Sequence, residues 1–123
     1  MAVGCTITER YIEAVKKITW AWTSAADGTL TGVTTTTTAP YDGKLLGFTT
    51  IPDGVAAPDD NYDVTVTDSD GHDVLLGAGA NRDTATTEYA NQTTIAAVAS
   101  SKLTLAVAGA GSGKKGTAIL WIK

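Results

Sequence analysis

The sequence of 123 residues predicts an all-β protein: an antiparallel β-sandwich, for which a jelly roll is one fitting arrangement, with little or no helix. Several short segments alternate apolar and polar residues, which is the pattern of a strand with one buried face. Turn signals rich in Gly, Asp and Pro separate these segments, and no long helical period appears. Many short strands joined by such turns are typical of sandwiches and jelly rolls.

The N-terminal segment, residues 1–13, is predicted to be either a first strand or an arm that reaches a neighbouring subunit. The rest of the chain, residues 14–123, is predicted to form a single β-sandwich domain. It begins with a strand over residues 14–23, in which Trp20 and Trp22 fall on one face. Two tryptophans on one strand face can form a platform that stacks on sugars. We expect them in the core instead, because each buries a large apolar area.

A threonine-rich run, residues 29–38, follows a hairpin signal at Asp27-Gly28. Threonine is β-branched and favours extended backbone, so this run predicts an exposed or edge strand. A turn at residues 41–43 then leads into another strand over residues 44–51.

A β-hairpin is predicted in the middle of the chain. Residues 62–67 alternate apolar and polar side chains, with Val64 and Val66 expected to point inward. The turn Asp68-Ser69-Asp70-Gly71 offers side-chain acceptors for backbone amides and a glycine for positive φ. We expect the returning residues 72–76 to pair with the first run.

The last third of the chain alternates between ambiguous and well-marked segments. Residues 84–90 suggest a strand and residues 94–100 one short helical turn. Residues 103–107 predict a strand by their alternation, and a glycine-rich loop follows. Residues 117–122 are apolar on both faces, which predicts a central strand. Its second face would be covered by the N-terminal segment, by residues 84–100 or by another subunit.

Composition argues against several classes of protein. The formal net charge is −4 and charged residues make up only 18%, so we expect no nucleic-acid partner and a largely neutral surface. No apolar run approaches the ~20 residues of a membrane helix, and we expect no membrane partner. The N-terminus lacks the pattern of a secretory signal, and Cys5 is the only cysteine.

Motifs that suggest catalysis or ligand binding fail on inspection. The loop at residues 109–115 lacks the first glycine and the final Ser or Thr of a phosphate-binding loop, and a strand follows it instead of a helix. The aspartates of residues 68–73 do not match a calcium loop. Those of residues 59–63 leave open the weak, non-specific binding of a cation at the surface. His72 is the only histidine and sits beside a turn. We therefore predict no enzyme activity, no catalytic or metal-binding residue and no cofactor.

Five segments carry well-marked strand and turn motifs: Trp20–Thr23, Ala39–Lys44, Ala57–Thr84, Ser101–Val107 and Gly113–Lys123. These motifs resemble those of small structural proteins of tailed-bacteriophage virions. The resemblance covers nearly the whole chain beyond residue ~10. It implies a small β-sandwich that sits on the virion after assembly in the host cytoplasm, as a capsid decoration (cement) protein.

This reading names two partners: the major capsid protein, and the chain itself in a homo-oligomer, with a trimer favoured. A variant of the hypothesis places the protein in the head–tail connector or the tail. A carbohydrate-binding β-sandwich module is the alternative from another class. The residues expected at the oligomer or capsid interface are Thr6, Ile7, Arg10, Tyr11, Leu120 and Trp121.

Overall fold

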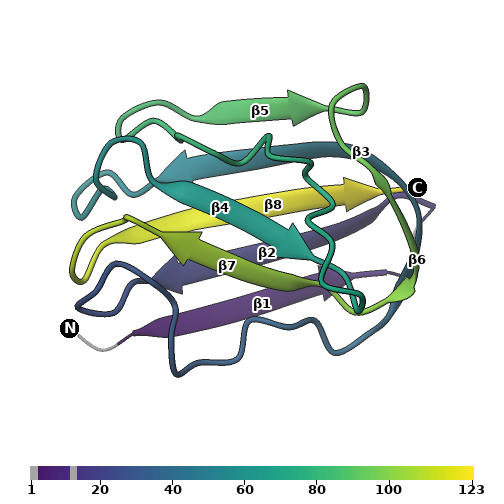
Figure 1. Cartoon of the computed structure of the whole chain (residues 1–123), viewed down its shortest axis with the longest axis horizontal. Coiled ribbons are helices and arrows are strands. Elements are labelled where there is room, and N and C mark those ends of the chain that lie inside the picture. The colour runs from purple at the N-terminus through teal and green to yellow at the C-terminus, as the bar shows by residue number, and fades with distance from the viewer. Residues whose placement is uncertain (1–2, 12–13) are drawn as a thin grey trace.

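The computed structural model describes residues 3–11 and 14–123 and shows an antiparallel β-sandwich (Figure 1). A six-stranded sheet has the order β1-β2-β8-β3-β5, with β6 also paired to β3. A two-stranded sheet of β4 and β7 lies over one face of it. The predicted fold class is confirmed, and no described residue is helical. The strands are β1 Gly4–Arg10, β2 Lys16–Thr23, β3 Tyr41–Pro52, β4 Asp63–Thr67, β5 Glu88–Asn91, β6 Ala97–Ser101, β7 Thr104–Ala108 and β8 Lys115–Ile122.

The hydrophobic core lies between the two sheets. Trp20 and Trp22 point inward from β2 and are almost completely buried, as predicted. The indole nitrogen of Trp20 donates a hydrogen bond of 2.9 Å to the Thr35 carbonyl, so its polar atom is satisfied inside the core. The burial of both tryptophans removes the predicted alternative of a sugar-stacking platform. Other fully buried core residues are Ile18, Leu45, Phe48, Val66, Val74, Leu75, Leu103, Leu120 and Ile122.

The N-terminal segment supplies the first strand. β1 pairs with β2 over seven residue pairs and forms one edge of the large sheet. The arm reading therefore does not hold for residues 4–10, whereas residues 12 and 13 of the predicted segment lie outside the described residues.

The predicted hairpin at residues 62–76 is wrong in its pairing. β4 pairs over five residues with β7, not with the segment that follows it. That segment contributes only a bridge at Thr67 and Asp73 and a hydrogen bond of 2.8 Å from the Val74 amide to the Val66 carbonyl. The Asp73 carboxylate accepts hydrogen bonds from two later amides, those of Leu75 and Gly77, and so bends the chain into turns. The turn at residues 68–71 and the inward valines are as predicted.

Three other expectations need correction. The run at residues 29–38 forms no regular strand, although Thr35 and Thr37 are buried and their backbone pairs with the chain at β7. The predicted turn at residues 41–43 lies inside β3. The predicted helical turn at residues 94–100 is not helical: from Ala97 on the chain is extended and belongs to β6, which pairs with the first half of β3. The described residues include no helix that is long and apolar enough to span a membrane.

Candidate functional site

The large sheet has an outer face on which no other described segment packs. The strand registers place alternate residues there, and β4 and β7 lie on the opposite side (Figure 1). Threonines and apolar side chains make up most of this face, which is a poor composition for a purely solvated surface and a good one for protein contact. The outer-face residues are Thr6, Thr8, Arg10, Lys17, Thr19, Ala21, Thr49, Ile51, Tyr89, Thr117, Ile119 and Trp121.

A β-bulge in β3 shapes the centre of this face. Leu45 lies opposite Ile122, but Gly47 lies opposite Trp121, so Leu46 is an extra residue in its strand. Leu46, Gly47 and Trp121 line a hollow of about 150 Å³, which we call the apolar hollow. It is large enough for one aliphatic side chain of a partner. Such a pocket around a half-buried tryptophan is the usual form of an interface anchor site.

A wider depression of about 440 Å³ lies at the other end of the same face. The loop around Pro52 and Asp53 forms one of its walls, and Thr117 and Lys115 of β8 line it as well. Its lining is mixed and open. Among the described residues, no set of metal-ligating or nucleophilic side chains converges on it.

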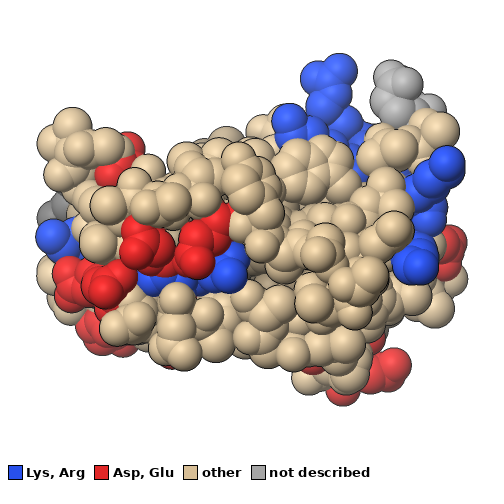
Figure 2. All heavy atoms as spheres, turned by 90° about the horizontal axis from the view of Figure 1, so that it is seen from above, with Lys and Arg blue, Asp and Glu red and all other residues tan. Residues whose placement is uncertain are grey.

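Five cationic residues gather at the end of the sheet where β8 ends. Arg10 of β1 lies directly opposite Lys17 of β2, and Lys17 lies opposite Trp121. The backbones of Lys44 and Lys123 exchange two hydrogen bonds, of 2.9 and 3.0 Å. Lys16 completes the group, which we call the basic rim. Figure 2 shows lysine and arginine atoms concentrated at its right-hand end, on the side away from β4 and β7.

The structure divides the predicted interface residues into two groups. Thr6, Arg10 and Trp121 lie on the outer face. Leu120 is wrong, because neighbouring residues of a strand point to opposite faces and it is completely buried in the core. Ile7 is partly buried and packs against the core from the inner side of β1, and its role at an interface stays a prediction.

Tyr11, the remaining predicted contact, is about half exposed. Its ring meets that of Tyr41 edge to face, with centroids 6.3 Å apart. The Tyr41 hydroxyl in turn donates a hydrogen bond of 2.8 Å to the Glu9 carboxylate. Tyr11 therefore extends the edge of the molecule beside β1 and is held there by the packing of its ring.

The Glu9 carboxylate joins β1 to the chain before β3. It accepts hydrogen bonds from the Thr38 amide at 2.9 Å and the Thr38 hydroxyl at 2.7 Å. The Ala39 amide donates a further one at 3.2 Å. Burial raises the pKa of Glu9, but these bonds and the one from Tyr41 outweigh it, so the pKa lies below its usual value. Burial, the hydrogen bond to Glu9 and its charge all raise the pKa of Tyr41.

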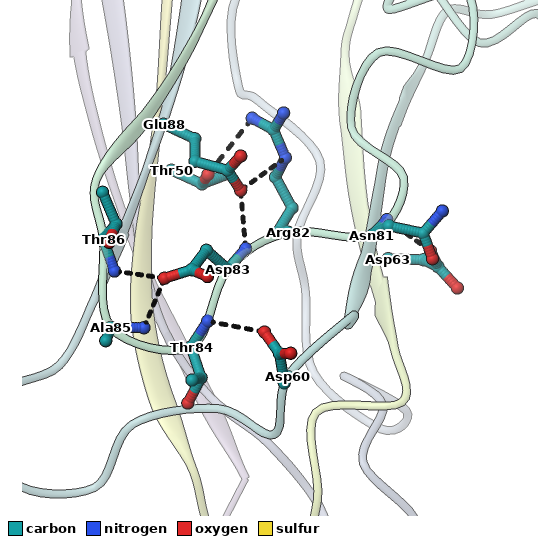
Figure 3. A network of polar contacts seen from close by, with 10 residues as sticks. All are labelled: Thr50, Asp60, Asp63, Asn81, Arg82, Asp83, Thr84, Ala85, Thr86 and Glu88. Atoms are coloured by element: carbon teal, nitrogen blue, oxygen red, sulfur yellow. Dashed lines mark hydrogen bonds and ion pairs between the residues drawn. The ribbon is translucent and has the colours of Figure 1, made fainter.

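A second polar cluster surrounds Arg82, a buried arginine on the chain beside β4 (Figure 3). One terminal nitrogen donates a hydrogen bond of 3.3 Å to the Thr50 hydroxyl of β3. Its Nε lies 3.6 Å from the Glu88 carboxylate of β5. Arg82 thereby ties the second layer to the large sheet. The role is structural, because both of its side-chain partners belong to the fold.

The acidic side chains around this cluster accept hydrogen bonds from backbone amides. Asp83 accepts hydrogen bonds from the amides of Ala85 and Thr86, and Asp60 accepts one from Thr84 (Figure 3). These bonds hold the pKa of Asp83 below its usual value. Within residues 3–11 and 14–123, no three His, Cys, Asp or Glu side chains come together as a metal site would require.

The two isolated nucleophile candidates have unreactive surroundings. His72 is exposed beside the turn that ends β4. Cys5 is partly buried on the inner side of β1, and desolvation raises the pKa of its thiol to about 11. A thiol with that pKa is protonated at neutral pH and is a weak nucleophile.

The basic rim and the apolar hollow are the parts of the site that sequence reasoning missed. The cations of the rim lie on four strand ends far apart in the sequence, so each looked isolated. The hollow depends on a bulge, for which the residue pair Leu46-Gly47 gives only a weak signal.

Comparisons with known proteins add little beyond the geometry. No protein-family model matches the chain, and no curated protein matches it. One solved structure similar to it is a cupin domain from Bordetella pertussis Tohama I, with 10% sequence identity and a TM-score of 0.39. The similarity covers 98% of this chain and 94% of that chain.

Proposed function

We propose that this protein is a non-enzymatic structural protein of a phage virion that decorates the head. It would act as a cement protein, binding major capsid subunits through the outer face of its large sheet. The outer face carries the proposal: it is broad, mostly uncharged and shaped by the apolar hollow around Trp121. The resemblance of the strand and turn motifs to virion proteins directs the choice of partner.

The mechanism is surface clamping without chemistry. Three strands in the middle of the large sheet, β2, β8 and β3, form a stiff platform because each has paired strands on both of its sides. A rigid face loses little conformational entropy on docking. A trimer would join three such faces, so that docking of one holds the others at high effective concentration near their sites.

The first experiment measures assembly and binding. Size-exclusion chromatography with light scattering on the pure protein is expected to show a homo-oligomer of three chains. Mixing with heads purified from the phage is expected to give saturable decoration. A protein that stays monomeric and binds no heads contradicts the proposal, and binding to tails in place of heads moves it to the connector or tail.

Two variants test the outer face itself. Gly47→Ala places a methyl group 3.8 Å from the Trp121 ring, an ordinary contact that partly fills the apolar hollow without strain. Trp121→Ala removes the anchor side chain. We expect each to weaken head binding about tenfold or more, which is the range of an interface anchor. Val55→Ala, which truncates an apolar side chain that is fully exposed elsewhere, is the control.

A loss of head binding can be assigned to the outer face only if the variant is still folded. Gly47→Ala is therefore the decisive variant, and its melting temperature is expected to stay close to that of the wild type. If Gly47→Ala and Val55→Ala bind heads equally well, the hollow is not a contact site.

A further inference from the structure

Among the residues that the structure describes, no carboxylate forms an ion pair with the basic rim. Two nearby carboxylates accept hydrogen bonds from groups outside the rim. That of Glu9 accepts them from the amides and hydroxyls described above, and that of Asp42 from the amide and hydroxyl of Ser100. The Lys16 ammonium reaches only a backbone carbonyl, that of Asp42, at 3.3 Å. Within the described residues, no rim cation has a carboxylate within ion-pair distance. Glu13 lies outside the described residues.

This arrangement works against the stability of the isolated fold. Arg10 and Lys17 are direct cross-strand neighbours, and like charges in that position repel. Five of the nine Lys and Arg residues gather at this end, although the chain carries a formal net charge of −4. A group of unpaired cations at one end of an acidic protein is what an anionic partner would recognise.

We propose that the basic rim binds an acidic patch on the surface of the partner protein, next to an apolar side chain that enters the apolar hollow. This inference rests on the proposed function and names the chemistry of the surface that the protein clamps. Lys17 connects the two parts, because it is the cross-strand neighbour of Trp121. An apolar centre bordered by charged residues is the common anatomy of a protein–protein interface.

A folded acidic protein fits the rim better than a nucleic acid does. Nucleic-acid sites follow the backbone along a basic stripe and carry stacking aromatic or groove-reading side chains. Here the rim cations stop at one end of the sheet and form no stripe along the strands, and the remaining outer face consists of threonines, aliphatic residues and the rings of Tyr89 and Trp121. The aliphatic side chains and the apolar hollow offer contacts that a protein surface can match and a phosphate backbone cannot.

The experiment compares two double charge reversals of equal size. Lys17→Glu with Lys44→Glu removes two cations from the rim, and Lys114→Glu with Lys115→Glu changes the other end of the molecule by the same charge. Both proteins are first checked for an unchanged melting profile. Binding to purified phage heads is measured at low and at high ionic strength, and retention on immobilised poly-L-glutamate and on duplex DNA is measured in parallel.

The rim variant is expected to bind heads about tenfold more weakly at low ionic strength and to lose most of the salt dependence. It is also expected to lose retention on poly-L-glutamate, whereas the control variant keeps both. Equal binding by the two variants overturns the inference while leaving head decoration intact.

Two other outcomes separate the inference from the proposed function. If the wild type ignores heads, decoration fails, and the poly-L-glutamate comparison still decides whether the rim recognises acidic polypeptide. Retention on duplex DNA without retention on poly-L-glutamate assigns the rim to nucleic acid and overturns the inference.

Discussion

The two layers of this sandwich are built in different ways. In the large sheet, β2 is paired over seven residues with β1 and over eight with β8, so backbone ladders carry the structure. In the second layer, the only ladder is the five pairs of β4 and β7. The chain on either side of that ladder is held by side chains, above all Asp73 and Thr37. The difference shows that one layer follows strand periodicity, whereas the other depends on individual polar contacts.

The largest effect is expected from the core side of the second layer. Val64→Asp would bury a charge with no partner, which costs about 3–5 kcal/mol of unfolding free energy. Thr65→Asp is the control on the same strand, because its side chain points away from the core. Urea unfolding of both variants measures the difference. Equal and small losses would mean that the second layer is not part of the cooperative core.

A smaller loss is expected where a side chain replaces a ladder. Asp73→Ala removes the acceptor for the amides of Leu75 and Gly77 and a longer contact of 3.3 Å from the Val66 amide. Amides left without partners cost about 1–3 kcal/mol in total when partly exposed. The matched variant is Asp70→Ala, in the neighbouring exposed turn. Equal losses of melting temperature in Asp73→Ala and Asp70→Ala would show that backbone pairing suffices to hold this layer too.

The smallest effect concerns Glu9 and depends on pH. Its pKa is lowered in the folded state, so its contribution is present above the pKa of the unfolded chain, about 4.3, and is lost as pH falls through the folded value. At pH 7 the unfolding free energy of Glu9→Gln should therefore be about 1 kcal/mol lower than that of the wild type, and its melting temperature should be lower as well. We expect the two curves to converge once the pH has fallen below the folded-state pKa of Glu9, which is lower than the unfolded one. A gap that stays constant with pH would assign the effect to geometry and not to charge.

Sequence patterns predicted the large sheet well where the information is local. Trp20 and Trp22 reveal the buried face of β2 by period-two spacing, and β8 follows from the same rule, as does β7 of the second layer. The doubly apolar end of β8 predicted a central strand with contacts on both faces. It did not reveal which apolar set faces the core, which is why Leu120 and Trp121 were both expected outside although only Trp121 lies there.

The strand pairing of the second layer could not be predicted from local sequence patterns. β4 has a nearby apolar run that looks like a hairpin partner, yet Val64 pairs with Val107, more than forty positions away. Long-range pairing wins because β7 offers a full alternating face, while the Asp73 carboxylate turns the nearer run away. Threonines such as Thr35 and Thr37 led to the prediction of a strand where none forms, because β-branching favours extended backbone but does not ensure regular pairing.

The candidate site was predictable only in part for a related reason. Thr6, Arg10 and Trp121, three of the predicted interface residues, lie on the outer face, but the basic rim assembles from strand ends that meet only in the folded sheet. Lys44 and Lys123 are neighbours through two backbone hydrogen bonds that no spacing rule contains. Patches built from separate strands are visible only once strand order and register are known.

The order of the strands also sets how the molecule responds to a pull. β1 starts at one end of the large sheet and β8 finishes at the other, with β2 between them (Figure 1). Tension applied between Gly4 and Lys123 therefore runs along the strands and shears β1 and β8 past β2. Within each of these two ladders, of seven and eight register pairs, the pairs share that force and have to yield together, because none can be peeled open first. A protein stretched from its two ends in this way would behave as a stiff strap.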